Sequence, residues 1–318
     1  MAIRRILHRF WQKLANAGAS QDAERFHDAL QVGDSVGPDH RIAGYLGAGG
    51  FGYTYTARRS DGECVALKEC FPVEFCRRSG SEVGLRAQDE AEALDAIKTR
   101  FIEEAEILRA LNHPNIVRGG KLIEANGTAY IEMEAIRGNV LGTYVSQWLR
   151  GLSLTELSKI TTQMLDALGH IHDQGYIHKD ISPDNIMLTS DGTAKLIDFG
   201  SATRLEVQNA EDPMLVVKAG YSPQEFYRAD AKIDKASDLY QLGATLRHCI
   251  TGKRPVESIE RLMAKARGRK DPLPPMPRLA TSGQRKVLEP IDKAMAVLLA
   301  DRMPTAADWR DGSDRRAG

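Results

Sequence analysis

The stretch that decides the fold reads His178-Lys179-Asp180-Ile181-Ser182-Pro183-Asp184-Asn185, and thirteen residues after Asn185 comes Asp198-Phe199-Gly200. Asp180, Asn185 and Asp198 are two carboxylates and an amide in a fixed order. Phosphoryl transfer needs such a set, because one carboxylate orients a hydroxyl while an amide and a second carboxylate hold Mg²⁺. Hard oxygen ligands suit magnesium and would not suit a softer metal.

A glycine-rich segment, Gly47-Ala48-Gly49-Gly50-Phe51-Gly52, lies upstream between two strand-like runs. Alone it is a weak signal, since glycines also serve any tight hairpin. A dinucleotide-binding fold would open a helix after the third glycine, whereas strands are predicted here on both sides. Glycines in a hairpin let the backbone approach phosphates with no side chain in the way.

Sixteen residues further on, Val65-Ala66-Leu67-Lys68 ends an apolar strand pattern with a lysine. Held over a nucleotide, Lys68 would neutralise α- and β-phosphate oxygens, and it would need an acid to fix its position. Glu104 flanks the apolar stripe of the helix predicted around residues 100–111 and could face inward. The alternative is that this helix carries only solvated glutamates.

In this order, the motifs resemble those of the eukaryotic-like protein kinases, and in detail their bacterial serine/threonine branch. The resemblance covers about residues 38–312. The matching segments are GAGGFG, VALK, EEAEIL, HPNIV, HKDISPDN, DFG, the degenerate Ser222-Pro223-Gln224-Glu225, and Ser237-Asp238-Leu239-Tyr240-Gln241-Leu242-Gly243.

The resemblance implies a role for each matched residue. Lys68 would pair with Glu104 and hold ATP phosphates, Asp180 would orient the acceptor hydroxyl, and Asn185 and Asp198 would bind Mg²⁺. Ala66 and Leu188 would sandwich adenine, with Met133 behind the pocket and Glu134–Ile136 as the hinge. The full set of implied nucleotide-binding positions is Gly47, Gly49, Gly50, Phe51, Gly52, Thr54, Ala66, Lys68, Glu104, Met133, Glu134, Ile136 and Leu188.

Two structural contacts are also implied. Glu225 should pair with Arg302, and Asp238 should accept backbone N–H groups of the catalytic loop. His178 is mainly structural in this family.

The sequence departs from the family pattern at several positions. Thr54 replaces a valine over adenine, Gln224 interrupts Ala-Pro-Glu, and Lys179 replaces the arginine that grips a phosphorylated activation loop. Ser182 stands where most such kinases carry a catalytic-loop lysine, while Lys218 stands where they carry a threonine. Hydroxyl and amine have therefore changed places. We expect the Lys218 amine to reach the catalytic site near Asp180 and the γ-phosphate, where it would restore the missing positive charge; otherwise it is an exposed loop lysine.

The predicted fold class is α+β, with two lobes: a small antiparallel sheet with one long helix over about residues 38–137, and a mainly helical lobe over about 138–312. Residues 1–37 would be an extension and 313–318 a short tail. Strands are expected from 42 to 67, at 121–123 and 129–133, and between 176 and 197. The expected helices of the second lobe are 152–173, 236–252, 257–267, 284–299 and 304–310.

The long helix of the first lobe should begin well before Arg100, because its stripe can be followed from about Ala87 to Leu111. The residues ahead of it, 71–86, are expected to form an irregular insert.

The extreme N-terminus has a different pattern. Ile3, Ile6, Leu7, Phe10, Trp11 and Leu14 recur at helical spacing, with basic residues mainly off that face. Such a helix can pack on its own domain, dock on a protein partner or lie on an anionic membrane surface.

Composition excludes several classes. Of 318 residues 42% are hydrophobic, which permits a sizeable core, and 43 basic residues balance 43 acidic ones. A protein that coats nucleic acid would show a basic excess. The four cysteines, Cys64, Cys70, Cys76 and Cys249, have no CxxC spacing, which favours reduced thiols over zinc or disulfides. With neither a signal peptide nor a membrane span evident, we expect a cytoplasmic protein.

The sequence thus predicts ATP- and Mg²⁺-dependent transfer of the γ-phosphoryl group to Ser or Thr hydroxyls of protein substrates. A pseudokinase that binds ATP or acts as a scaffold is the first alternative, supported by Ser182. A kinase-fold enzyme acting on a small molecule or lipid is the second, and the segment 219–225, which resembles a peptide-docking loop, argues against it.

Overall fold

The structure, a computed structural model, describes residues 27–49, 52–87, 90–147, 152–207, 215–228, 231–276 and 282–314. The chain divides into two compact units: unit 1 is residues 1–112 with 117–136, and unit 2 is residues 113–116 with 137–318. The predicted amphipathic helix at 3–14, the candidate residues Gly50 and Phe51, and most of the predicted tail lie outside the described residues.

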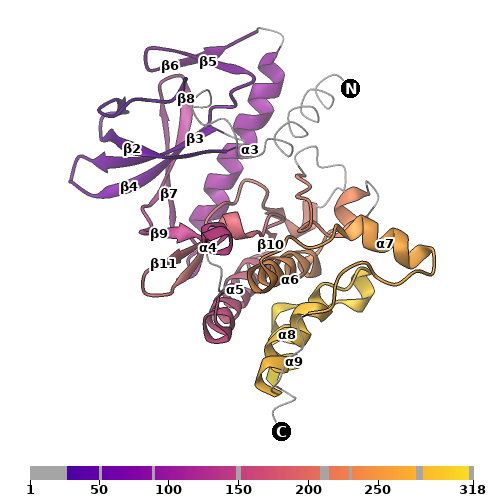
Figure 1. The fold of residues 1–318 in the computed structure, drawn as a ribbon. Coiled ribbons are helices and arrows are strands. Elements are labelled where there is room, and N and C mark those ends of the chain that lie inside the picture. Colours follow the sequence, from indigo (N-terminus) through magenta and orange to yellow (C-terminus); the bar gives the residue numbers. More distant parts are fainter. Residues whose placement is uncertain are drawn as a thin grey trace. The chain divides into compact units, whose positions relative to one another are not determined.

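Unit 1 is built on an antiparallel sheet with strand order β1-β2-β3-β4-β8-β7 (Figure 1). Its strands alternate buried and more exposed residues, as a sheet covered on one face requires. Gly62, at φ +89°, closes the tight turn between β3 and β4. The strands are β1 (Ser35–Val36), β2 (His40–Gly49), β3 (Gly52–Arg59), β4 (Cys64–Glu69), β7 (Gly119–Ala125) and β8 (Thr128–Glu134).

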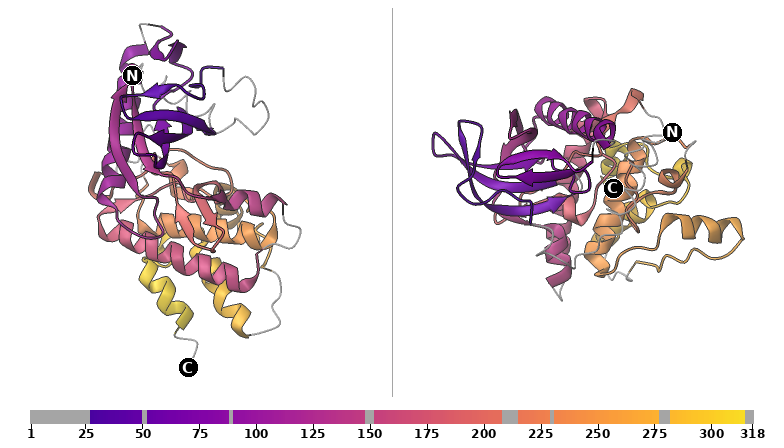
Figure 2. Two further views of the ribbon diagram at one scale, coloured as in Figure 1. Left: turned by 90° about the vertical axis from the view of Figure 1, so that its left-hand side faces the viewer. Right: turned by 90° about the horizontal axis from the view of Figure 1, so that it is seen from above.

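The long helix of unit 1 is α3 (Ala91–Ala110), which packs on β7 (Figures 1 and 2). Its buried stripe includes Leu94, Ile97, Phe101 and Leu108, at the spacing of one helix face. Twenty residues rise about 30 Å. The prediction that this helix begins well before Arg100 is confirmed, and it ends where the backbone turns extended shortly before His113-Pro114.

The expectation of an irregular insert at 71–86 was wrong. This segment holds an antiparallel hairpin of β5 (Cys76–Ser79) and β6 (Glu82–Leu85), with Gly80 at φ +61° in the turn. The hairpin is ordered because the Arg78 side chain, only 6% exposed, binds the buried carboxylate of Glu69 on β4. The polar stretch 71–86 therefore contributes Arg78 to a buried ion pair with Glu69.

Unit 2 is mainly helical, and its small sheets are β12-β11-β9 and β10-β13. The helices are α4 (Leu141–Gln147), α5 (Leu154–Asp173), α6 (Lys235–Thr251), α7 (Ser258–Ala266), α8 (Ser282–Ala294) and α9 (Ala306–Asp314). The strands are β9 (Gly138–Val140), β10 (Tyr176–Ile177), β11 (Ile186–Thr189), β12 (Ala194–Leu196) and β13 (Thr203–Arg204). Short 3₁₀ turns are η2 (Pro183–Asn185), η3 (Leu205–Val207), η4 (Gln224–Tyr227) and η5 (Leu299–Asp301).

The helix predicted at 284–299 ends five residues early, because α8 stops at Ala294. The guanidinium of Arg302 donates to the carbonyls of Ala296 and Val297 at 2.7 and 3.0 Å. These bonds fold the chain after α8 into a turn that leads to η5. The other predicted helices of unit 2 are found within a few residues of their expected bounds.

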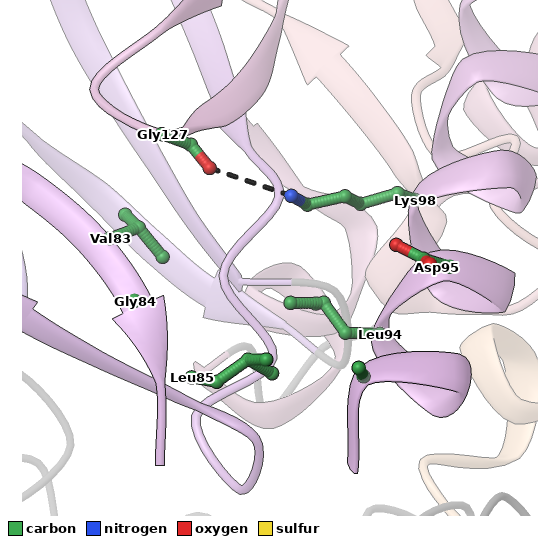
Figure 3. A pocket seen from close by; sticks show the side chains of 8 residues that line it. Val83, Gly84, Leu85, Leu94, Asp95, Lys98 and Gly127 are labelled. Atoms are coloured by element: carbon green, nitrogen blue, oxygen red, sulfur yellow. Dashed lines mark hydrogen bonds between the residues drawn. The ribbon is translucent and has the colours of Figure 1, made fainter. Parts of the chain in front are cut away.

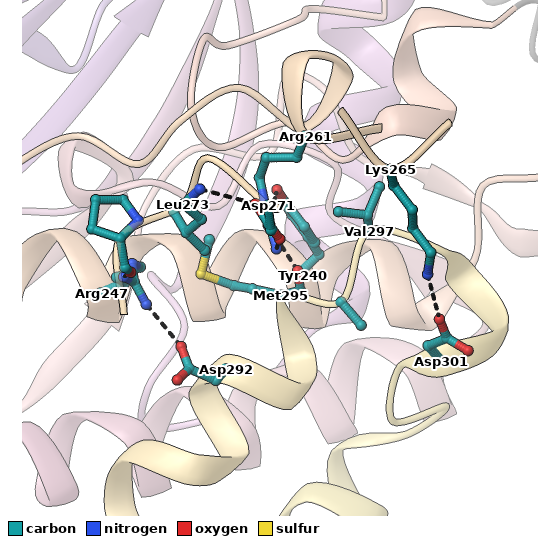
Figure 4. Close-up of polar contacts among 12 residues, drawn as sticks. Tyr240, Arg247, Arg261, Lys265, Asp271, Leu273, Asp292, Met295, Val297 and Asp301 are labelled. Carbon is teal, nitrogen blue, oxygen red and sulfur yellow. Dashed lines mark hydrogen bonds and ion pairs between the residues drawn. The ribbon is translucent and has the colours of Figure 1, made fainter. Parts of the chain in front are cut away.

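The core of unit 2 includes a polar network around Arg261, which is 5% exposed (Figure 4). Its guanidinium donates to the Asp271 carboxylate, to the Tyr240 hydroxyl and to the Met295 carbonyl, at distances of 2.8–3.2 Å. Hydrogen bonds raise the pKa of Arg261 although burial lowers it, so the charge is kept and satisfied. The network ties α6, α7 and the end of α8 together. Among the described helices, no segment is long and apolar enough to cross a membrane.

Candidate functional site

Several predicted nucleotide-binding residues share one face of the unit 1 sheet. Directly paired residues lie on the same face, as do residues two apart along a strand. Gly47 pairs with Thr54, Thr54 with Lys68, and Ala66 with Met133, while Ala66 and Lys68 are two apart on β4. The register therefore gathers these five positions from four strands onto one face.

Lys68 and Glu104 form a close ion pair within unit 1. The Lys68 Nζ lies 2.7 and 2.9 Å from the two carboxylate oxygens of Glu104. The Glu104 side chain is 1% exposed and that of Lys68 is 13% exposed. The predicted inward orientation of Glu104 is confirmed, and the pair holds an ammonium group near the centre of the gathered face.

The glycine-rich segment is partly described. Gly52, at φ +140°, is required by close approach, because a Cβ there would lie 2.3 Å from the Glu69 carbonyl and 2.4 Å from the Phe71 nitrogen. Gly47 is half-buried and Gly49 is exposed, and a Cβ on either would meet nothing within 4 Å. Glycine at these two positions is not explained by packing within the described residues, which leaves their predicted use as a phosphate-facing backbone.

The predicted hinge and adenine residues fall on both units. The backbone N–H of Arg118 donates to the Glu134 side chain at 2.9 Å, and the sequence passes from unit 1 to unit 2 after Ile136. Leu188 lies on β11 of unit 2 and is 8% exposed. The expected sandwich of Ala66 and Leu188 around adenine stays a prediction.

In unit 2, the buried Asp238 of α6 organises the loop that contains Asp180. Its carboxylate accepts the backbone N–H groups of His178 and Lys179 at 2.9 and 2.8 Å, and it contacts Nε2 of His172 at 2.8 Å. Burial raises the pKa of Asp238, but these hydrogen bonds and the nearby histidines outweigh it and lower the pKa. The predicted bracing contact is confirmed.

Two further α6 side chains hold the same loop and were missed from the sequence. Gln241 accepts the Ile181 N–H and donates to the Lys179 carbonyl, while Thr245 donates to the Ile181 carbonyl. Their spacing from Asp238, at i+3 and i+7, puts all three on one helix face. A polar stripe on an otherwise buried helix was the signal available. The bonds sustain Lys179 at φ 67°, a strained conformation for a non-glycine residue.

Asp180 and Asn185 are joined directly. The Asn185 amide nitrogen donates to the Asp180 carbonyl and to Asp180 Oδ2, each at 2.8 Å. The Ile197 N–H donates to the Asn185 carbonyl at 3.0 Å. This bond holds the residue that precedes Asp198 against Asn185. Asp198 Oδ1 accepts the Gly200 N–H at 3.0 Å.

The side chains of Asn185 and Asp198 fit a magnesium ion whose remaining ligands come from substrate phosphates and water. With its nitrogen committed to Asp180, Asn185 has its side-chain oxygen left for a cation, and Asp198 adds a carboxylate. Mg²⁺ is usually held by one or two carboxylates with substrate phosphates and waters. Among the described residues no group of three or more His, Cys, Asp or Glu forms a self-sufficient metal site, and such a cage is not what this chemistry needs.

Lys218 reaches the same loop from the segment between β13 and η4, which is called the activation segment below. Its Nζ donates to Ser182 Oγ at 2.7 Å and lies 3.4 Å from Asp180 Oδ1 and 3.8 Å from Asp184 Oδ2. Its side chain is 28% exposed. The expected approach of this amine to Asp180 is therefore present in the structure, and the solvent-directed alternative is not.

The end of the activation segment is fixed by Glu225. Both of its oxygens accept from the Arg302 guanidinium, at 2.6 and 2.9 Å, and Ser237 Oγ donates to Oε1 at 2.8 Å. The ion pair predicted for Glu225 and Arg302 is confirmed. It is fully buried, so removing either partner would leave an unpaired charge in the core.

A separate pocket of about 180 Å³ lies in unit 1 between β6 and α3 (Figure 3). It is lined by Val83, Gly84, Leu85, Ala91, Leu94, Asp95, Lys98 and Gly127. None of the predicted site residues lines this pocket.

A family model described as the protein kinase domain matches residues 41–302. The chain belongs to the protein kinase family. The solved structure described as the PpkA-294 apo form is similar to this protein kinase with a TM-score of 0.76 and 28% sequence identity, covering 90% of this chain and 99% of that one. The predicted α+β, kinase-like fold class is confirmed by this similarity.

Two curated relatives carry serine/threonine kinase names. The chain is 32% identical over 215 residues to the probable serine/threonine-protein kinase zyg-1 of Caenorhabditis briggsae, covering 66% of this chain and 26% of that protein. It is 30% identical over 230 residues to the probable serine/threonine-protein kinase PknB of Lactococcus lactis, covering 72% and 34%. The chain thus spans about a third or less of these relatives. Membership of the protein kinase family implies ATP as the phosphoryl donor.

Proposed function

We propose that this protein kinase transfers the γ-phosphoryl group of Mg-ATP to Ser or Thr hydroxyls of proteins. The observation that carries the proposal is the arrangement of Asp180, with Oδ2 held by Asn185 and Oδ1 3.4 Å from the Lys218 ammonium. A carboxylate fixed in this way, 19% exposed, can accept a hydrogen bond from an incoming hydroxyl.

Phosphoryl transfer exchanges one oxygen–phosphorus bond for another. The acceptor oxygen forms a bond to the γ-phosphorus as the bond from that phosphorus to the β,γ-bridging oxygen breaks, and ADP leaves with the electron pair. Asp180 orients the hydroxyl and takes its proton as the new ester forms. The Lys68 ammonium, held by Glu104, balances negative charge on the α- and β-phosphates.

We also propose that Mg²⁺ accompanies ATP at this site. Asn185 and Asp198 would hold it, and it would screen the negative charge of the phosphate oxygens. The hard oxygen donors of this pair support Mg²⁺ over a softer metal.

The test is incubation of the full chain with radiolabelled Mg-ATP and a generic basic protein, followed by phosphosite mapping. We expect label on Ser and Thr of the added protein, at least about 10²-fold less label with Asp180→Asn, and none with excess chelator. Nucleotide binding without any transfer would identify a pseudokinase and overturn the proposal. Label confined to small molecules or lipids would overturn the assignment of protein substrates.

A cytoplasmic location and a docking function for segment 3–14 are further proposals. The first is supported by free thiols: Cys70, Cys76 and Cys249 are buried and burial raises the pKa of each, while Cys64 is exposed. The second, docking on a partner protein or an anionic membrane surface, is supported by the sequence pattern alone.

A further inference from the structure

We infer that Lys218 is a catalytic residue, which supplies from the activation segment the positive charge that the catalytic loop lacks at Ser182. The inference rests on the proposed function and names one more group that touches the transferred phosphoryl. Its basis is a direct contact within unit 2 between two residues that are 36 positions apart in the sequence.

The contact places a cation beside the atom that orients the acceptor. Lys218 Nζ lies 2.7 Å from Ser182 Oγ and 3.4 Å from Asp180 Oδ1, the oxygen that Asn185 does not bind. Ser182 is fully buried, so its hydroxyl is a fixed hydrogen-bond partner for the ammonium. If an acceptor hydroxyl donates a hydrogen bond to Asp180 Oδ1, the phosphoryl group that it receives would lie within reach of the Lys218 ammonium.

The backbone of Lys218 is held firmly enough to aim its side chain. Its N–H donates to Ser222 Oγ at 2.8 Å, and its carbonyl accepts the N–H groups of Tyr221 and Ser222 at 3.0 and 2.9 Å. The turn needs Gly220, at φ +80°, because a Cβ there would lie 2.6 Å from the Pro255 carbonyl.

Two further contacts anchor this turn to the helices of unit 2. The Tyr221 hydroxyl lies 2.5 Å from His248 Nδ1 on α6, and Ser258 on α7 donates to the Ser222 carbonyl at 2.8 Å. The turn that carries Lys218 is therefore held in place by α6 and α7.

The local charges explain why a cation is needed here. Asp180 and Asp184 both face Lys218, at 3.4 and 3.8 Å, and Asp198 adds a third carboxylate to the loop region. A nucleotide would bring further negative charge, and Ser182 offers none to offset it. In a partly desolvated site an ammonium positioned before the reaction stabilises charge that develops in the transition state.

A purely structural salt bridge is the competing explanation, and the exchange of residues allows a direct test. The variants are Lys218→Thr, Ser182→Lys and the double variant, which restores the usual family arrangement. The exposed Lys270, in the loop after α7, provides the matched control Lys270→Ala. Each variant is assayed for kcat, for KM of ATP and of a peptide, for ADP affinity and for its melting temperature.

We expect Lys218→Thr to lower kcat by about 10²- to 10³-fold, with ADP affinity changed less than about threefold. The double variant should regain at least about tenfold in kcat, a coupling that a mere anchor would not produce. Lys270→Ala should match the wild type.

A Lys218→Thr enzyme with kcat close to that of the wild type would overturn the inference. A double variant that melts like the wild type yet is no more active than Lys218→Thr would also overturn it. An inert wild-type enzyme would instead overturn the proposed function itself, and the inference with it, so the two failures are distinguishable.

Discussion

Arg78 and Glu69 form a buried ion pair in which Nη2 of Arg78 lies 2.7 Å from each carboxylate oxygen of Glu69. The hydroxyls of Tyr55 and Tyr130 donate to the same carboxylate at 2.8 and 2.7 Å. Burial, with the nearby negative charge, raises the pKa of both tyrosines. Glu69 thus accepts from strands β3, β5 and β8, and it joins the β5–β6 hairpin to the main sheet.

Arg78→Ala should therefore lower the free energy of unfolding of unit 1 by about 3–5 kcal/mol, because it leaves the Glu69 carboxylate buried without its counter-ion. The matched control is Arg77→Ala, an exposed arginine on the same strand, which should change stability by less than about 0.5 kcal/mol. Urea unfolding followed by tryptophan and tyrosine fluorescence measures both. Equal effects of the two substitutions would show that the ion pair does not hold the hairpin.

The sequence could predict most of the sheet and the long helix, because both carry periodic apolar patterns. It could not predict the hairpin at 76–85, since its strands expose many of their residues and its order depends on Arg78 meeting Glu69 across nine positions. Nor could it predict where α8 ends, because the chain after Ala294 is folded into a turn by bonds from the Arg302 side chain to carbonyls five and six residues back, which leave no periodic pattern.

For the candidate site, the Lys68–Glu104 and Glu225–Arg302 pairs were predicted through the resemblance to the kinase family, and the apolar stripe beside Glu104 supported the first of them. The approach of Lys218 was also predicted by comparison with the family pattern. Gln241 and Thr245 were missed, although they form a polar stripe with Asp238 on a buried helix, because the backbone atoms that they bind are brought to α6 only by the tertiary fold.

Lys68→Ala should reduce phosphotransfer by at least about 10²-fold with the fold kept, and it should also lower the melting temperature, because the buried Glu104 carboxylate loses its counter-ion. Glu104→Gln is therefore a useful companion, since it keeps the shape of the pair and removes one charge. If Glu104→Gln retained full activity, the ion pair would not be what positions Lys68.

Asp198→Ala and Asp180→Asn should separate metal binding from acceptor orientation. Asp198→Ala removes one of two proposed magnesium ligands, so Mg²⁺-dependent nucleotide affinity and turnover should both collapse. Asp180→Asn should lower transfer by about 10²- to 10⁴-fold and keep nucleotide affinity, as expected for loss of a general base. Isothermal titration with Mg-ADP and a peptide assay measure the two effects. A fall in Mg-ADP affinity as large as the fall in activity for Asp180→Asn would contradict its assigned role.

Stability of unit 2 should fall on mild acidification, with His178 contributing. The ring is fully buried, its Nδ1 accepts the Asp180 N–H at 3.2 Å, and burial lowers its pKa. Because the folded-state pKa lies below the unfolded value near 6.5, the unfolded chain binds the proton first as pH falls, at up to about 1.4 kcal/mol per pH unit. This contribution is present above about pH 6.5 and is lost below it.

The comparison is urea unfolding of the wild type and His178→Phe at pH 7.5, 6.5 and 5.5. Burial also lowers the pKa of His113 and His248, so the wild-type slope has several sources and the difference between the two proteins isolates His178. The aromatic replacement can keep the edge contact with Phe199, whose ring centroid lies 4.8 Å away. Identical slopes would show that His178 does not carry this pH dependence.

The enzyme should be active without phosphorylation of its activation segment. Between Gly200 and Lys218 only Ser201 and Thr203 carry hydroxyls, and Thr203 is paired with Ile177 through β13 and β10. Lys179 replaces the arginine that would grip a loop phosphate, and a lysine lacks the bidentate fork. The segment that carries Lys218 is instead fixed by hydrogen bonds to α6 and α7, which need no phosphate. We therefore expect phosphatase-treated enzyme to keep activity within about twofold of a sample protected by phosphatase inhibitors. Intact mass checks that the treated enzyme carries no phosphate.

The Ser201→Ala and Thr203→Ala variants should also keep activity within about twofold of the wild type. Loss of activity on phosphatase treatment that is restored by a phosphate on Thr203 would show that the hydrogen bonds of residues 218–222 are not sufficient to hold the segment in its working position.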